Sequence, residues 1–301
     1  MTRTLLGACL LMASVSCTVE VPVPDVTEVP LTFDPVMYVA AKGDVAPGEY
    51  PAGLPFGVSA WKYPAGQHWT GEEAVSLLSN ERITDHEKIW EPIPPVLWPD
   101  RKQRCAFLAY APYGAAAEIN RTEGIIFQSV DTATDQTDLL YTILTDGLNE
   151  ASGNGVVNLA FRHALCRIDF ELRCNASEGE SADALQLSLD GIGCVGTFHS
   201  LPAPTWGLEG DSQELGFFAG EQDLSHTNDP IGDARWVIPQ FLRASVVLVL
   251  RHHAILGGDT VETLRSAPLS IPLDPGRHYT FSLSCALDTG TLKVDLLDDL
   301  L

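Results

Sequence analysis

Short apolar runs separated by turn residues recur along most of the chain, and this pattern constrains the fold more than any other feature. The runs are rich in Val, Ile, Leu, Thr and aromatic residues, and clusters containing Gly, Pro, Asn or Asp divide them. No helical period is sustained beyond about three turns, and only residues 71–78 indicate a short helix or turn. Brief strands with frequent turns are typical of sandwiches, so the sequence predicts an all-β protein. Clear runs in the first half occupy residues 31–33, 56–61, 106–111 and 125–127.

The second half opens with a long strand-like pattern over residues 157–173. Cys166, Ile168, Phe170 and Leu172 fall on one face of an extended chain, because charged or polar residues separate them. Neighbouring strand residues point to opposite faces, so we expect this set to face a core. Near the end of the chain, residues 287–294 predict a closing hairpin.

The length of 301 residues is at the limit at which a single core usually splits, so we expect two domains. A hydrophobic content of 45% is enough to fill both cores. Residues 147–154 form a polar stretch with two glycines and no periodicity, which favours a domain boundary there. The predicted units are therefore an N-terminal sandwich at 29–150 and a C-terminal sandwich at 151–301.

The N-terminus has the order of a signal peptide. Arg3 precedes an apolar segment at residues 5–15, and Ser16-Cys17 follows. The segment is too short for a membrane span, which needs about 20 residues. We therefore expect a signal peptide at 1–16 and a lipoprotein that is acylated, for example with palmitate, at Cys17.

Two other interpretations of this end of the chain stay open. Cleavage before Cys9 fits the small-residue pattern but leaves almost no apolar segment ahead of the cut, and an ordinary secretory signal could end near a cysteine by chance. After Cys17, Pro22 and Pro24 favour extended backbone, so residues 17–28 are predicted to be a tether.

Charge and cysteine content narrow the classes of partner. Forty acidic and 18 basic side chains give a net charge of −22, which would repel a phosphate backbone and argues against nucleic acid. The cysteines beyond Cys17 are odd in number, so they cannot form a complete disulfide framework. Most lie in apolar strand patterns, where buried thiols are expected. These cysteines are Cys105, Cys166, Cys174, Cys194 and Cys285.

Short motifs that resemble catalytic or metal sites have simpler explanations. Asp288-Thr289-Gly290 matches an aspartic-protease motif, but it occurs once and at a predicted turn. His252 and His253 are adjacent in a strand, so they point to opposite faces. Asp131, Asp135 and Asp138 lack the glycine and glutamate of a calcium loop, although a weak divalent site stays open. The sequence predicts a protein that is not an enzyme and has no cofactor or metal.

Five segments, taken in order, resemble the fimbrillin (Mfa-like) family of Gram-negative anaerobes of the gut and mouth. Each is weak alone, but their order and spacing span most of the expected mature chain. They are Trp98-Pro99 leading into residues 107–112, residues 136–141, residues 159–168, Ile238-Pro239-Gln240, and residues 275–279.

The resemblance implies two tandem transthyretin-like β-sandwich domains and a lipidated precursor that builds a surface fimbrium. In that family a strand of one subunit fills a groove in its neighbour, so the implied partners are other subunits in a homopolymer or heteropolymer. It also implies attachment to the outer membrane through the lipid, with a host protein or glycan as a candidate receptor for adhesion.

The segment at 29–40 is our hypothesis for the exchanged strand, with Val29, Leu31, Phe33 and Tyr38 as its residues. Stalk subunits of the family are cut after an arginine just past the first strand. Here no arginine lies between Cys17 and Arg82, and Lys42 is the only basic residue near that position. Lys42 is therefore the candidate processing site, and stalk, anchor and accessory roles stay open.

The alternative is a surface lipoprotein that binds glycan through tryptophans without polymerising. Four of the six tryptophans lie in the N-terminal half and could stack on sugars, although packing in a core is the simpler role. They are Trp61, Trp69, Trp90 and Trp98.

Overall fold

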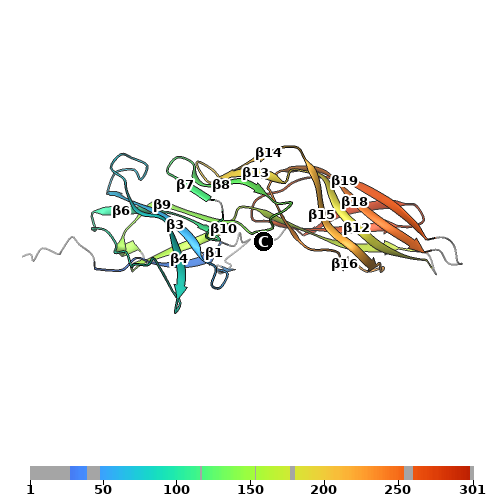
Figure 1. Ribbon diagram of the computed structural model, residues 1–301, viewed down its shortest axis with the longest axis horizontal. Coiled ribbons are helices and arrows are strands. Elements are labelled where there is room, and N and C mark those ends of the chain that lie inside the picture. Colours follow the sequence, from blue (N-terminus) through green and yellow to red (C-terminus); the bar gives the residue numbers. More distant parts are fainter. Residues whose placement is uncertain are drawn as a thin grey trace, which may run out of the picture.

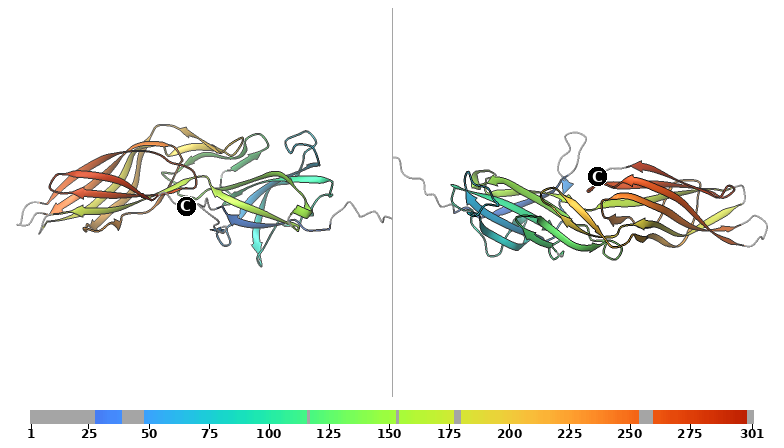
Figure 2. Two further views of the ribbon diagram at one scale, coloured as in Figure 1. Left: turned by 180° about the vertical axis from the view of Figure 1, so that it is seen from behind. Right: turned by 90° about the horizontal axis from the view of Figure 1, so that it is seen from above.

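Strands dominate the computed structural model, which describes residues 28–38, 48–115, 117–152, 154–176, 180–253 and 260–298. Within these ranges the only helical turn is η1 (Glu150–Ser152), so the predicted all-β class is confirmed. Residues 71–74 form a turn, and a strand begins at Val75. The two halves of the chain lie end to end along the long axis of the molecule (Figures 1 and 2). No helix among the described residues has the length and hydrophobicity to cross a bilayer.

A closed eight-stranded sheet forms the N-terminal half. Parallel pairing of the first strand with the last closes the sheet around an apolar interior. In order around the sheet, its strands are β10 (Val156–His163), β9 (Leu140–Leu148), β6 (Gln103–Ala111), β3 (Phe56–Pro64), β4 (Val75–His86), β5 (Ile89–Glu91), β1 (Thr32–Met37) and β2 (Gly48–Glu49).

Strand β6 shows why the sequence gives this arrangement. It is apolar from Cys105 to Ala111 without interruption, and every residue of that run is buried. Phe107 faces the interior of the closed sheet, whereas Leu108 and Tyr110 face a second apolar cluster outside it. A strand with both faces covered needs a continuous apolar run instead of alternation.

The cover on that outer face is a sheet to which both halves of the chain contribute. Its strands, in order, are β14 (Thr205–Glu209), β13 (Val195–His199), β8 (Gly124–Asp131) and β7 (Ala117–Asn120). Phe198 of β13 pairs with Phe127 of β8, so the β13–β14 hairpin reaches back onto the N-terminal half. In Figure 1 these four strands lie together above the junction of the two halves.

Two facing sheets make up the rest of the C-terminal half. One contains β16 (Asp229–Pro230), β11 (Cys166–Asn175), β20 (His278–Ala286) and β21 (Thr291–Asp298), with β17 (Arg235–Val237) also paired to β11. The other contains β15 (Gln213–Asp223), β12 (Ser181–Ile192), β18 (Phe241–His253) and β19 (Val261–Pro272). Their inner faces share one core, in which Phe170 of β11 meets Phe217 of β15 edge to face at 4.8 Å.

Two local predictions in this half are confirmed. The face of β11 that carries Cys166, Ile168, Phe170 and Leu172 is buried in the core. Strands β20 and β21 form the closing hairpin, and Gly290 in its turn has a φ of +68°, which favours glycine. Asp288-Thr289-Gly290 therefore lies in the turn of this hairpin.

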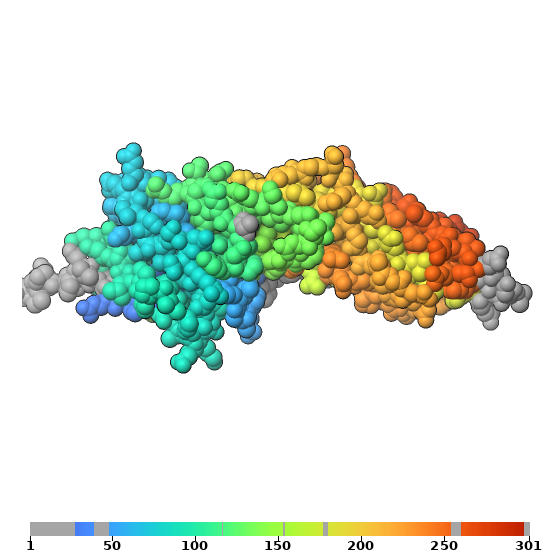
Figure 3. All heavy atoms as spheres, viewed as in Figure 1, coloured from blue at the N-terminus to red at the C-terminus, as the bar shows by residue number. Residues whose placement is uncertain are grey.

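Strand pairing continues across the boundary expected after residue 150. Strand β10, which follows that point, pairs with β1 and β9 of the closed sheet. Hydrogen bonds also cross this boundary: the Trp236 amide donates to the Gln136 side-chain oxygen at 2.7 Å, and the Gln136 side-chain amide donates to the carbonyl of Trp236 at 3.1 Å. In the space-filling view the two halves are in continuous contact (Figure 3).

Candidate functional site

The first strand, β1, is the segment singled out for exchange, and its side chains alternate between the core and the surface. Leu31, Phe33 and Met37 are 0%, 4% and 9% exposed, whereas Asp34 and Tyr38 are exposed. This period of two follows from the sequence of the strand and sets which face enters the closed sheet. Val29, just before the strand, is half-buried against the same core.

The pairing of β1 is strongly one-sided. On one side every residue of β1 from Thr32 to Met37 has a partner on β10, in parallel register. On the other side only Phe33, Val36 and Met37 have partners, on β5 and β2. Pro35 has no amide proton to donate, which further limits the ladder. Strand β10 therefore pairs with β1 along its whole length, whereas the short strands β5 and β2 pair with it only at Phe33, Val36 and Met37.

The segment before β1 is fixed by a few backbone contacts. The amide of Leu31 donates to the carbonyl of Val96 at 2.7 Å, and the amide of Trp98 donates to the carbonyl of Val29 at 3.0 Å. The Trp98 indole N–H donates to the carbonyl of Gly155 at 2.8 Å, beside the start of β10. These bonds place Val29 and Leu31 at the entrance of the groove.

Aromatic rings line the groove that β1 occupies. The ring of Phe33 meets Phe56 and Phe107 edge to face, with centroids 6.0 and 6.1 Å apart. Tyr50 packs on Phe161 at 5.0 Å, and burial raises the pKa of its hydroxyl. Removal of β1 would expose this cluster, so the groove needs an apolar occupant.

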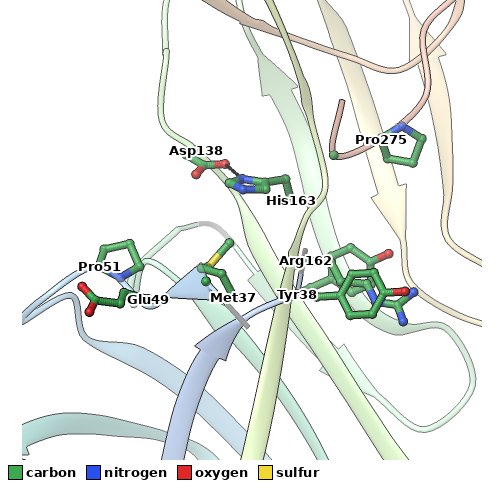
Figure 4. Close-up of a pocket in the computed structure, with 11 residues that line it drawn as sticks. Met37, Tyr38, Glu49, Pro51, Asp138, Arg162, His163 and Pro275 are labelled. Carbon is green, nitrogen blue, oxygen red and sulfur yellow. Dashed lines mark hydrogen bonds and ion pairs between the residues drawn. The ribbon is translucent and has the colours of Figure 1, made fainter. Parts of the chain in front are cut away.

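A pocket of about 470 Å³ lies where β1 ends. Figure 4 shows Tyr38 beside Arg162, and Asp138 directed at His163. The Arg162 guanidinium lies 4.1 Å from the centroid of the Tyr38 ring, a cation–π contact between β10 and the end of the first strand. Burial raises the pKa of Tyr141 in the wall of the pocket, and the positive charge of Arg162 opposes this shift.

The His163 ring has its hydrogen-bond and stacking partners within the protein. Its Nδ1 lies 2.9 Å from a carboxylate oxygen of Asp138, and its ring stacks on Trp236 at 5.3 Å. Among the described residues that line the pocket there is no serine, threonine or cysteine. These contacts give His163 a structural role that links β10 to the C-terminal half.

Other candidate residues have structural partners. The Asp131 carboxylate accepts hydrogen bonds from the Ala133 amide and the Thr134 hydroxyl, and Asp135 accepts two from Thr137. No group of three His, Cys, Asp or Glu side chains within the described ranges is arranged to hold a metal.

The tryptophans do not form an exposed platform. Trp69 and Trp98 are buried, and Trp61 and Trp90 are half-buried, packed on Trp69 and on Phe56 respectively. Sugar stacking requires an exposed ring face, so these contacts favour the packing role.

Cys17 and Lys42 lie outside the described residues, as do the predicted signal peptide at 1–16 and residues 39–40 of the predicted exchange segment. Val29, Leu31, Phe33 and Tyr38 are described and lie together along the groove. Sequence reasoning missed β10 as the partner of β1 and Arg162 as the partner of Tyr38. Alternation marks β10 as a strand, but nothing local indicates which strand it pairs with.

Comparison with solved structures gives relatives of the same fold. A fimbrial protein from Bacteroides vulgatus matches with a TM-score of 0.66 and 15% identity over 89% of this chain and 98% of that one. A protein from Bacteroides ovatus proposed to act in cell adhesion gives 0.57 and 13%, over 90% and 96%. A similar one from Bacteroides uniformis gives 0.54 and 13%, over 90% and 98%.

Comparison of the sequence with curated proteins gives no match. A family model described as fimbrillin-like, in contrast, matches residues 46–294. That range is most of the chain, and it runs from β2 of the closed sheet into β21, the last strand of the C-terminal half. The chain therefore belongs to the fimbrillin-like family.

Proposed function

We propose that this protein is a structural and adhesive subunit of a cell-surface fimbrium, assembled by β-strand exchange at the groove of β1. The observation that carries the proposal is the one-sided attachment of β1. It pairs along its whole length with β10 and only at points with β2 and β5, above an aromatic groove. Membership of the fimbrillin-like family supports the same role.

Loss or displacement of β1 would leave the parallel edge of β10 unpaired. An unpaired edge can accept a strand from another chain, whose main-chain hydrogen bonds give affinity and whose alternate side chains give register. The vacated positions of Leu31, Phe33 and Met37 would require apolar side chains at every second or fourth residue of the donor. The partners are other subunits, as a homopolymer or a heteropolymer.

Attachment to the cell is the second part of the proposal. Acylation at Cys17 would tether the protein to the outer membrane through the extended segment at 17–28. Cleavage near Lys42 would release β1 together with the tether, since both precede that residue in the chain. An uncut chain would act as an anchor or accessory subunit, and a cut chain as a stalk subunit.

Deletion of residues 29–38 tests strand exchange. We expect the shortened protein to bind a synthetic peptide of residues 29–38 and to form SDS-resistant oligomers when mixed with chains that can donate a strand. A peptide with Phe33→Asp should not bind, because it places a charge among the rings of Phe56 and Phe107. A peptide with Asp34→Asn, altered on the exposed face, is the matched control.

Size-exclusion chromatography with light scattering measures the oligomers, and calorimetry measures the peptide. Strand exchange is wrong if the shortened protein folds, stays monomeric and binds none of the peptides.

Mass spectrometry of protein recovered from cells separates the attachment alternatives. An acylated N-terminus at Cys17 identifies an anchor or accessory subunit, and an N-terminus just beyond Lys42 identifies a processed stalk subunit.

A further inference from the structure

Two cysteines in the C-terminal core lie directly opposite each other on neighbouring strands. Strands β11 and β20 run parallel, and their register pairs Cys174 with Cys285. Register partners on adjacent strands point to the same face of the sheet. Both side chains enter the C-terminal core and are 2% and 0% exposed. In this structure both are free thiols, and a hydrogen bond between them shifts their pKa values in opposite directions.

The other three described cysteines have different surroundings. The Cys166 thiol donates to the carbonyl of Val237 at 3.5 Å, and the Cys194 thiol donates to the carbonyl of Ile192 at 3.8 Å. Cys105 lies in the N-terminal closed sheet, where burial raises its pKa to about 12. Among the five described cysteines, strand register therefore places only one pair face to face.

Neighbouring groups shift the pKa values of both thiols. The hydrogen bond from Cys174, together with the positive charge of Arg265, lowers the pKa of Cys285. The Nε of Arg265 is buried without a hydrogen-bond partner. The same thiol hydrogen bond raises the pKa of Cys174, since its proton is held between the sulfurs. In the closed core Cys285 is therefore the more acidic of the two thiols.

We propose that Cys174 and Cys285 form a disulfide that joins β11 to β20 in the exported protein. This disulfide rests on the proposed surface function, because disulfides persist outside the reducing cytosol. A small disulfide or the disulfide of a thiol oxidoreductase is the oxidant. During folding, the thiolate of one of the two cysteines attacks it and releases one donor thiol. The thiolate of the other cysteine then attacks this protein sulfur in the mixed disulfide and releases the second thiol, so two protein thiols are oxidised and one donor disulfide is reduced.

The bond would join segments that are far apart in the chain. It closes a loop of about 110 residues, and a long loop restricts the unfolded chain strongly. Strand β20 also carries the closing hairpin with β21, so the cross-link would fasten the end of the chain to the centre of its sheet. Because both sulfurs are buried, oxidation must precede closure of the core.

Refolding of the purified full chain in a glutathione redox buffer tests the geometry. After denaturation and alkylation without reductant, we expect two fewer alkylated cysteines than in the reduced chain, and one linked peptide that contains Cys174 and Cys285. Reduction should lower the Tm of the protein by roughly 5–10 °C. Cys174→Ser should abolish both effects, and Cys166→Ser, at another buried cysteine of the same strand, should preserve the linked peptide.

The wild-type chain gives the decisive result even if a variant does not fold. Full alkylation of the refolded chain, or a linked peptide with other cysteines, overturns the proposal. Protein recovered from the cell surface should contain the bond, and a reduced pair there overturns it as well. Recovery of the chain from the cytosol would instead count against the surface function, and the redox-buffer result would then decide on the disulfide.

Discussion

Phe33 is the side chain that joins β1 to the N-terminal core. It is 4% exposed and contacts the rings of Phe56 and Phe107. We expect Phe33→Ala to lower the free energy of unfolding by about 3–5 kcal/mol, since it removes a large buried ring and leaves a cavity. Asp34→Ala, on the exposed face of the same strand, should change it by less than about 0.5 kcal/mol. Denaturant titration measures both, and equal effects would contradict the alternating burial of β1.

Tyr50 gives the N-terminal core a dependence on alkaline pH. Burial raises the pKa of its hydroxyl, which donates to the carbonyl of Leu54 at 3.1 Å. In the unfolded chain a tyrosine titrates near pH 10, so the contribution of the protonated hydroxyl is complete below that pH and is lost as pH rises above it. We expect the free energy of unfolding to fall less steeply above about pH 10 in Tyr50→Phe than in the wild type.

Denaturant titrations at a series of pH values measure that slope. Phe56→Leu, in the same ring cluster, is the control, because it should lower stability at every pH and leave the slope unchanged. Equal slopes in the wild type and Tyr50→Phe would show that the hydroxyl titrates normally in the fold.

Single residues of the site could be predicted to different extents. Burial of Leu31 and Phe33 follows from an alternation that is visible within a few residues of sequence. The contact of Tyr38 with Arg162 joins positions far apart in the chain, and no local pattern specifies it. Packing of the tryptophans agreed with the simpler expectation, because large apolar rings usually find a core.

At the scale of elements, the β13–β14 hairpin depends on a close approach of two strands. A Cβ on Gly196 would lie 2.7 Å from the carbonyl oxygen of Gly207 and 3.2 Å from Ile238. We therefore expect Gly196→Ala to destabilise the protein by about 1–3 kcal/mol, since the backbone of β14 cannot move away freely. A Cβ on Gly207 has its nearest neighbour at 3.9 Å, so Gly207→Ala should be tolerated.

Hydrogen exchange of the β13 amides, together with denaturant titration, checks this difference. Faster exchange is expected in Gly196→Ala and not in Gly207→Ala. If the alanine at 207 is the more damaging of the two, the close packing of this hairpin does not control its stability.

The elements that could be predicted are those with local causes. The β20–β21 hairpin follows from turn residues between two apolar runs, and the core face of β11 follows from its alternation. The parallel pairing of β1 with β10 and the antiparallel pairing of β8 with β13 across the halves could not be predicted. Each joins strands that many others separate in the chain, and strand propensity carries no information about partner or register.

At the scale of the whole molecule, the two halves share a core instead of meeting at a linker. Phe198 comes from the second half, yet its ring stacks on Phe127 at 5.7 Å and lies 4.9 Å from Tyr141. Trp206 of the next strand packs on Phe198 at 5.4 Å. We therefore expect the junction of the two halves to resist bending, because any hinge there would expose these rings.

This shared core predicts that the N-terminal half cannot complete its fold alone. A fragment of residues 28–165 contains the closed sheet but lacks β13 and β14, so β8 has an open edge and Phe127 and Tyr141 lose their cover. We expect the fragment to be digested rapidly by protease and to regain resistance when a peptide of residues 193–211 is added. The same peptide with Phe198→Ala should protect poorly, because Phe198 is 1% exposed and central to the contact. Peptide with Thr205→Ala, altered at an exposed position, should protect as well as the native peptide. A fragment that resists protease without peptide would mean that the first half is an independent domain, and the shared sheet would then be a docking contact between two finished folds.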